Sequence, residues 1–189
     1  MVQRPTGVLE PLPLMILRAR QAPVRQGEAC AGPFAVEFGV LRVSVVDDDG
    51  RELIVDLAGP GDVVGGRAGE PAAWTVRAVG PVRLRPAPAD ARDTTSERLL
   101  QLALQLAWCA VSERVERRLA DLAERLGHPA PGGTAIGVPL TQDDLAAMVG
   151  ASRESTNRAL RVLVERGWLA VPRRGRYVVR SPLRAVGSA

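Results

Sequence analysis

Side chains that can recognise DNA bases are concentrated in one short stretch of the chain, residues 153–158. At about 100° per residue, a helix here carries Arg153, Glu154, Asn157 and Arg158 on one face. Arginine binds O6 and N7 of guanine through two hydrogen bonds, and glutamate accepts one from N4 of cytosine. The stretch has the chemistry of a base-reading helix, although a solvated helix face with ordinary charge pairs would show the same residues.

The residues around this stretch predict two short helices joined by a tight turn. Thr141 and Asp144 form a capping-box-like pair at the start of the first helix, and Gly150 ends it. Ser152 caps the second helix, which runs to about Arg166. The caps and the turn length favour a helix-turn-helix over a solvated helix. The buried stripe of the second helix is expected to contain Thr156, Ala159, Leu160, Leu163 and Val164.

A β-hairpin is predicted directly after the second helix, over residues 168–180. Two short apolar runs flank Pro172-Arg173-Arg174-Gly175, a turn signal in which the glycine supplies a positive φ. Arginines at the tip of such a wing suit contacts with DNA phosphates. Residues 138–189 contain nine arginines and four carboxylates, so this segment carries +5 in a chain of net charge +4. The positive charge is placed as nucleic-acid binding requires.

The segment Thr141-Gln-Asp-Asp-Leu-Ala…Val149-Gly-Ala-Ser-Arg-Glu-Ser-Thr-Asn-Arg158, with its wing, resembles the DNA-binding domain of the CRP/FNR family of bacterial transcription regulators. The resemblance implies that Arg153, Glu154 and Arg158 read a TGTGA-like half-site. Asn157 replaces a small residue common in the family and is a further base-reading candidate. The resemblance also implies a contact with RNA polymerase. The phosphate candidates are Thr141, Gln142, Ser152, Ser155, Arg161, Arg173, Arg174 and Arg176.

Short apolar runs separated by turn residues predict a small β-barrel or roll from Leu14 to about Pro88. The stretch Val46-Asp-Asp-Asp-Gly50 separates two alternating runs and indicates a hairpin turn rather than a metal cluster. The resemblance places the family's cyclic-nucleotide-binding β-roll here. The apolar runs are Met15–Leu17, Phe34–Val36, Val40–Val46, Glu52–Leu57, Trp74–Val76 and Val82–Arg85.

The effector cassette of this roll differs from that of the family's cyclic-AMP binders. Those proteins use a glutamate for the ribose and an Arg-Ser pair for the phosphate, at positions that align here with Gly66, Ala72 and Ala73. A phosphate buried without a cation or donors is costly, and only Arg67 and Arg77 lie near in sequence. We therefore expect no cyclic-AMP cofactor. The alternative is a regulator whose β-roll binds a cyclic nucleotide or another small effector.

A long helix apolar on all sides is predicted over residues 94–112, capped by Thr94, Thr95 or Ser96. In the resembling family this helix is the dimer interface, whereas a core helix of a single chain is the alternative. A second helix is expected over residues 113–126, followed by a linker rich in glycine and proline. The interface candidates are the coiled-coil seam Leu100, Leu104, Ala107 and Val111, with Trp108 beside it.

The expected architecture is α+β, with a β-roll over 1–93, a dimerisation helix over 94–112 and a winged helix-turn-helix over 113–189. Cys30 and Cys109 lack CxxC spacing, which predicts buried free thiols and no metal site. No Ser/His/Asp set, GxGxxG pattern or GK[ST] loop supports an enzyme. No apolar run resembles a signal peptide or a membrane span. We expect a cytoplasmic homodimer whose partner is double-stranded DNA.

Overall fold

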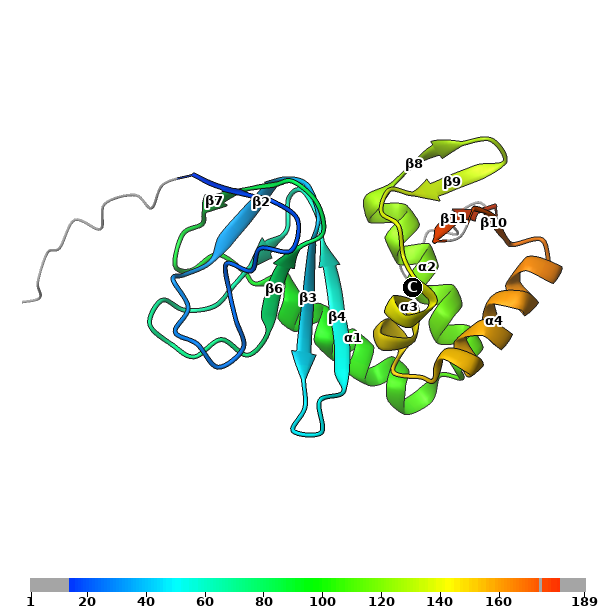
Figure 1. Ribbon diagram of the computed structural model, residues 1–189, viewed down its shortest axis with the longest axis horizontal. Helices are drawn as coiled ribbons and strands as arrows, with labels where there is room; N and C mark the ends of the chain where they lie inside the picture. Colours follow the sequence, from blue (N-terminus) through cyan, green and yellow to red (C-terminus); the bar gives the residue numbers. More distant parts are fainter. Residues whose placement is uncertain (1–13, 174, 181–189) are drawn as a thin grey trace, which may run out of the picture.

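The computed structural model describes residues 14–173 and 175–180, and it shows a β-rich N-terminal half and a helical C-terminal half (Figure 1). Two antiparallel sheets form the N-terminal half, with strand orders β1-β7-β2-β5 and β4-β3-β6. The predicted β-roll is confirmed, and only the two-residue strand β5 was not expected. The strands are β1 (Met15–Leu17), β2 (Phe34–Phe38), β3 (Leu41–Val46), β4 (Glu52–Ala58), β5 (Val63–Val64), β6 (Thr75–Ala78) and β7 (Val82–Pro86).

Alternating side chains of these strands fill the roll, because successive residues of a strand point to opposite faces. Phe34 and Val36 of β2 and Leu41 and Val43 of β3 are buried in one apolar cluster. The predicted hairpin between β3 and β4 is confirmed by antiparallel pairing along both strands. In its turn, Asp47 accepts a hydrogen bond from the N–H of Asp49, so the aspartates form a polar turn.

Two helices lead from the roll to the C-terminal half: α1 (Thr94–Trp108) and α2 (Val111–Leu126). Asp93, and none of the three predicted residues, caps α1 by accepting a hydrogen bond from the N–H of Thr95. The continuous helix predicted over 94–112 is wrong at its end, because Cys109 and Ala110 are extended. Both residue types are compatible with a helix, so the break comes from α2 turning away to bury its own apolar stripe.

The C-terminal half consists of α2, α3 (Gln142–Val149), α4 (Arg153–Glu165) and a four-stranded antiparallel sheet of order β10-β11-β9-β8. The segment after α2, expected to be an irregular linker, forms the hairpin of β8 (Gly127–Ala130) and β9 (Gly133–Ile136). The hairpin forms here because β9 pairs with β11 of the wing, about forty residues later in the sequence. The predicted wing is confirmed as β10 (Leu169–Arg173) and β11 (Arg176–Val179).

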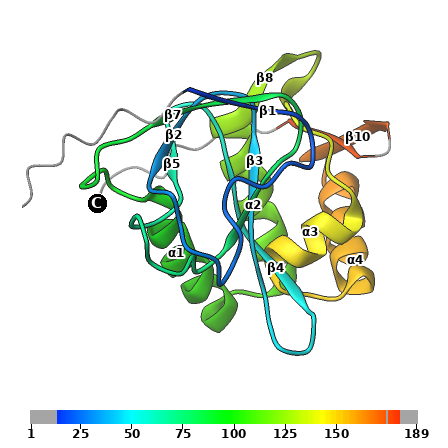
Figure 2. The same ribbon diagram turned by 60° about the vertical axis from the view of Figure 1, so that its left-hand side comes forward.

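The apolar core of the C-terminal half extends to one strand of the roll. Ile54 and Leu57 of β4 are buried in the same cluster as the inward faces of α2, α3 and α4. Figure 2 shows α3 lying beside the lower part of β4. Next to this contact, Arg42 of β3 pairs with Asp144 of α3 at 2.7 Å. The helix-turn-helix therefore packs directly on the roll and is not connected to it through α2 alone.

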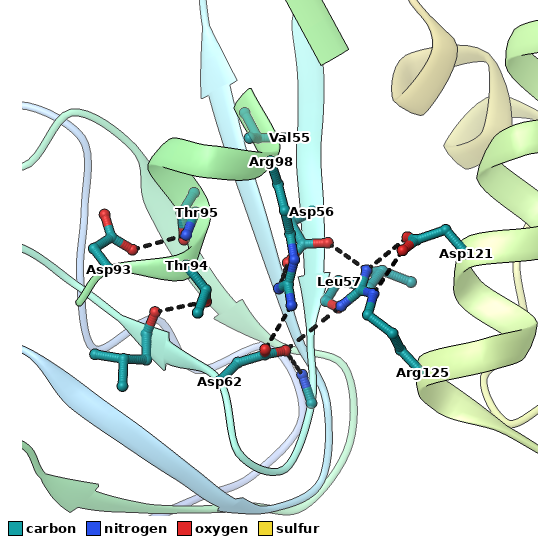
Figure 3. A network of polar contacts seen from close by, with 12 residues as sticks. Val55, Asp56, Leu57, Asp62, Asp93, Thr94, Thr95, Arg98, Asp121 and Arg125 are labelled. Carbon is teal, nitrogen blue, oxygen red and sulfur yellow. Dashed lines mark hydrogen bonds and ion pairs between the residues drawn. The ribbon is translucent and has the colours of Figure 1, made fainter. Parts of the chain in front are cut away.

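A buried charge network joins β4, α1 and α2 (Figure 3). The side chain of Asp56 is fully buried in β4 and pairs with Arg98 of α1 and with Arg125 of α2, the latter at 2.8 Å. Asp62 pairs with the same two arginines at 2.6 Å and 3.5 Å. Burial lowers the pKa of Arg125, but hydrogen bonds and charge from Asp121 and Asp56 outweigh it and raise the pKa above the ordinary arginine value.

Removing the buried carboxylate should destabilise the protein strongly. In Asp56→Asn, the largely buried guanidiniums of Arg98 and Arg125 lose the fully buried carboxylate that they share and keep only Asp62 in common, so we expect a loss in the free energy of unfolding that exceeds that of the control and reaches up to about 3–5 kcal/mol. Glu113→Gln, which removes the exposed partner of Arg117, is the control and should lose less than about 1 kcal/mol. Urea unfolding followed by circular dichroism measures both. Equal stabilities of the two variants would contradict a structural role for Asp56.

Candidate nucleic-acid interface

Local capping places the two helices of the helix-turn-helix as predicted. The Thr141 hydroxyl accepts from the N–H of Asp144 at 3.0 Å, and the Asp144 carboxylate accepts from the N–H of Thr141 at 2.9 Å. Gly150 ends α3 in the left-handed conformation, with φ of 57°, and a Cβ there would lie 2.7 Å from Leu106 of α1. Ser152 caps α4 by accepting from the N–H of Ser155. The left-handed backbone of the turn therefore favours glycine, whereas the Leu106 methyl group could move away from an added Cβ.

One side of α4 is buried against α2 and α3, and it matches the predicted stripe except at one position. Thr156, Ala159, Leu160 and Leu163 are buried. Val164 is 42% exposed, so its predicted burial is wrong. The residue stands at the edge of the stripe and lines the hollow next to the wing.

The opposite side of α4 exposes Arg153, Glu154 and Arg158 together. Arg158 is held by Glu154 at 2.7 Å and by the Ser155 hydroxyl at 3.1 Å. Arg153 lies 3.5 Å from Asp143 of α3. Exposed pairs of this kind contribute at most about 1 kcal/mol, so the arginines can exchange them for hydrogen bonds to bases. The geometry presents a guanidinium–carboxylate–guanidinium face suited to the major groove.

Asn157 is placed differently from these three residues. It is half-buried, and its Oδ1 atom is enclosed without a hydrogen-bond partner among the described residues. Its side chain faces a hollow between α3, α4 and the wing, so reading a base would require it to rotate outward. The hollow has a volume of about 380 Å³ and is lined by Gln142, Asn157, Leu160, Arg161, Val164, Glu165, Val171 and Tyr177.

The wing tip is fixed to the start of α3. The Leu140 N–H donates to the Gly175 carbonyl at 2.9 Å, and Gly175 has the positive φ predicted for it, 75°. This contact brings the wing arginines to the same end of the domain as the N-terminus of α3. Of the phosphate candidates, Thr141, Ser152, Arg161, Arg173 and Arg176 are exposed, Gln142 and Ser155 are half-buried, and Arg174 lies outside the described residues.

The aligned cassette positions of the roll hold small and apolar side chains. Ala72 is buried, Gly66 is half-buried and Ala73 is exposed. Trp74 is buried in the apolar cluster of the roll together with Ala72 and Cys30. Isolated bridges hold residues 71–76 against residues 24–29, a pairing that the sequence did not indicate. Ala72, Trp74 and Cys30 are thus part of the buried apolar cluster of the roll.

Both arginines near the cassette face outward. Arg67 is highly exposed and lies 3.8 Å from Glu70, and Arg77 is also exposed. Of the two thiols, both are free as predicted; Cys30 is buried, whereas Cys109 is only half-buried because the chain is extended there. In the described part of the chain no three His, Cys, Asp or Glu side chains are grouped as a metal site requires. None of the described helices is long and apolar enough to cross a membrane.

The predicted interface residues of α1 are uncovered in the single chain. Leu100, Leu104 and Trp108 are 61%, 48% and 84% exposed, and Ala107 is exposed beside them. Val111 lies beyond the helix break, in α2, and is half-buried against the C-terminal core. Four of the five predicted interface residues therefore lie on one helix.

Two family models match the chain in succession. A cyclic nucleotide-binding domain matches residues 15–93, and a Crp-like helix-turn-helix domain matches residues 113–184. The chain is 32% identical over 166 residues to the CRP-like cAMP-activated global transcriptional regulator of Mycobacterium tuberculosis, covering 76% of this chain and 74% of the relative. It is 30% identical over 207 residues to the nitrogen fixation regulation protein FixK of Azorhizobium caulinodans, covering 98% and 84%.

Solved structures show the same fold. TTHA1359, a CRP/FNR-family transcriptional regulator of Thermus thermophilus, is similar with a TM-score of 0.72 at 24% identity, over 91% of this chain and 95% of that one. FixK2 of Bradyrhizobium japonicum is similar with a TM-score of 0.74 at 21% identity, over 94% and 98%. The likeness extends across both halves of the molecule.

The two kinds of arginine in the interface should respond differently to DNA sequence and salt. Arg153→Ala should remove a bidentate guanine contact, lower affinity for an operator selected from random DNA by about 1–3 kcal/mol, and relax the preference at one base pair. Arg176→Ala should weaken all sequences about equally and reduce the salt dependence of binding. Fluorescence anisotropy with the selected and a base-substituted operator, at two salt concentrations, separates these effects. An equal loss on both operators for Arg153→Ala would make that arginine a phosphate contact.

Proposed function

We propose that this chain, which belongs to the CRP/FNR family of DNA-binding transcription regulators, acts as a homodimer on an inverted-repeat operator without requiring cyclic AMP. The observation that carries the proposal is the face of α4 on which Arg153, Glu154 and Arg158 are exposed while the opposite side is buried. The family consists of transcription regulators and not of enzymes. The resemblance to this family extends the proposal to a contact with RNA polymerase, for a regulator that is either an activator or a repressor.

The operator follows from the reading face and from two-fold symmetry. Two copies of α4 in a symmetric dimer address half-sites about one helical turn, roughly 34 Å, apart. Arg153, Glu154 and Arg158 would read a TGTGA-like half-site, with Asn157 as a further contact once its side chain rotates. Phosphate contacts from Thr141, Gln142, Ser152, Ser155 and Arg161, and from wing arginines Arg173, Arg174 and Arg176, would set the register of the protein on the duplex.

The dimer is supported by the apolar surface of α1. Large exposed apolar side chains that form a row on one helix favour association, because burying them removes apolar area from water at about 25 cal/mol per Å². Leu100 and Leu104 are one helical turn apart, and Trp108 follows after another turn. A second α1 packed along this row would cover Leu100, Leu104, Ala107 and Trp108, with Val111 at the end of the contact.

Independence from cyclic AMP is supported by the interior of the roll. A cyclic phosphate needs a cation and hydrogen-bond donors where it is buried. The aligned positions Gly66, Ala72 and Ala73 provide no side-chain donor, and Trp74 packs beside Ala72. Relatives of this chain carry names that describe activation by cyclic AMP. A small effector of another kind in the roll is the second candidate, supported by the match of this half to the cyclic nucleotide-binding domain.

Operator binding should not change when cyclic AMP is added. We expect the dissociation constant of the purified full chain for its selected operator to stay within about twofold between zero and millimolar cyclic AMP, since a tenfold change needs about 1.4 kcal/mol of binding energy that no cassette side chain is placed to supply. Anisotropy measures the affinity, and calorimetry with cyclic AMP alone measures binding to the roll. A complex that forms only with cyclic AMP would establish the ligand-dependent alternative.

Charge placed in the row on α1 should separate the subunits. Leu104→Glu puts an unpaired carboxylate into the proposed interface, which should cost several kcal/mol and yield monomers with weak operator binding. The control is Val46→Glu, which introduces the same charge at an exposed apolar residue at the end of β3. Sedimentation velocity measures the assembly. A Leu104→Glu protein that sediments as a dimer would place the interface elsewhere.

A further inference from the structure

A second polar cavity lies between α1 and α2, outside the roll and the DNA-binding face. Its volume is about 180 Å³, well below the roughly 300–1,000 Å³ of pockets for drug-sized ligands. The cavity is therefore of a size for a small ion or a short organic acid and is too small for a nucleotide. It is lined by Arg98, Gln101, Leu102, Gln105, Arg117, Arg118 and Asp121.

Arg118 is the unusual residue of this cavity. It is 8% exposed, and no carboxylate of the described residues lies within 4 Å of its guanidinium. Its hydrogen bonds are long. Nη2 donates to the carbonyls of Val55 and Met148, at 3.4 Å and 3.5 Å. Burial lowers the pKa of Arg118, although Asp121 and Asp56 oppose this, and an arginine stays protonated at such positions. A buried cation is thus left without a close counter-charge.

The other charged groups around the cavity are already paired. Arg98 is bound by Asp56 and Asp62, and Arg117 by Glu113 at 2.6 Å. Both carboxylate oxygens of Asp121 accept hydrogen bonds from Arg125, each at 2.9 Å. Asp121 therefore makes no ion pair with Arg118, although its charge favours the protonated guanidinium, and the donors that line the cavity without a carboxylate partner among the described residues are those of Arg118, Gln101 and Gln105.

We propose that this cavity binds a small oxyanion, with a phosphate or carboxylate group held by Arg118 and by the side-chain amides of Gln101 and Gln105. Hydrogen bonds from a guanidinium to an oxyanion are about twice as strong as neutral ones, and they are strongest where water is excluded. The anion supplies the counter-charge that Arg118 lacks. The site takes its donors from both α1 and α2, so binding ties the two helices together across the break at Cys109 and Ala110.

The site is compatible with the dimer. On a helical wheel at 100° per residue, the cavity-lining positions of α1 are centred on the order of 140° from Leu100, Leu104 and Ala107. A partner helix along Leu100, Leu104 and Ala107 therefore leaves the cavity open on the side of Arg98, Leu102 and Gln105, whereas Trp108 lies about 20° from Gln101 at the rim. Arg118 also contacts β4 through Val55 and α3 through Met148, so the anion lies where the roll, α1 and the helix-turn-helix meet.

Titration of the full chain with inorganic phosphate, and separately with malonate, tests the site. Calorimetry at constant ionic strength, balanced with sodium chloride, should give saturable binding of at least one anion, and the tighter one identifies the preferred group. Arg118→Met and Gln105→Leu should each weaken that binding about tenfold or more. Arg51→Gln removes an exposed arginine of the β3–β4 turn and should bind as the unmodified chain does.

Circular dichroism of each variant shows whether it has folded before its binding is compared. If Arg118→Met does not fold, Gln105→Leu decides, because it changes only the rim contributed by α1. The proposal is overturned if neither anion shows saturable binding to the unmodified chain. It is also overturned if a folded Arg118→Met binds the anion with unchanged affinity, or, where Arg118→Met does not fold, if Gln105→Leu does. If Arg51→Gln also loses binding, the heat measured by calorimetry comes from general surface charge, and the proposal is overturned as well.

Discussion

The pairing of buried Asp56 with Arg98 and Arg125 holds the molecule in one arrangement. A carboxylate without solvent exposure is stable only when its charge is compensated and its lone pairs are satisfied. One partner comes from α1 and the other from α2, so both helices are fixed to the same residue of β4. Asp62 bridges the same two arginines from the turn after β4. The proposed dimer helix and the DNA-binding half are thus both tied to the roll through this residue of β4.

The orientation of α4 depends on this junction. α3 packs on β4 and is held there by Arg42, while Gly150, in the turn before α4, lies against Leu106 of α1. A shift of α1 along the roll must therefore disturb the turn that positions α4. The roll and the DNA-binding half are therefore linked through β4, while Trp74 belongs to the separate apolar cluster of the roll. The linkage depends on packing and charge at β4.

The sequence by itself determined the parts whose signals are local. Caps at Thr141 and Ser152 with the left-handed Gly150 specify a helix-turn-helix within a dozen residues, because each capping bond spans three positions. The wing and the β3–β4 hairpin follow from turn residues between alternating apolar runs. The face formed by Arg153, Glu154 and Arg158 was predictable for the same reason, since helical periodicity places those side chains once the helix ends are known.

Only the tertiary structure decided the features that depend on contacts distant in sequence. The break after Trp108 and the β8–β9 hairpin arise because α2 and β9 find partners elsewhere in the chain, and local residue types permit other conformations there. Val164 is exposed because it lines the hollow between α3, α4 and the wing, and helical periodicity alone does not predict such a hollow. Arg118 is one of many arginines in the sequence, and its burial without a carboxylate follows from four elements meeting around it. The removal of a side chain from water depends on the assembled fold and cannot be predicted from any single segment.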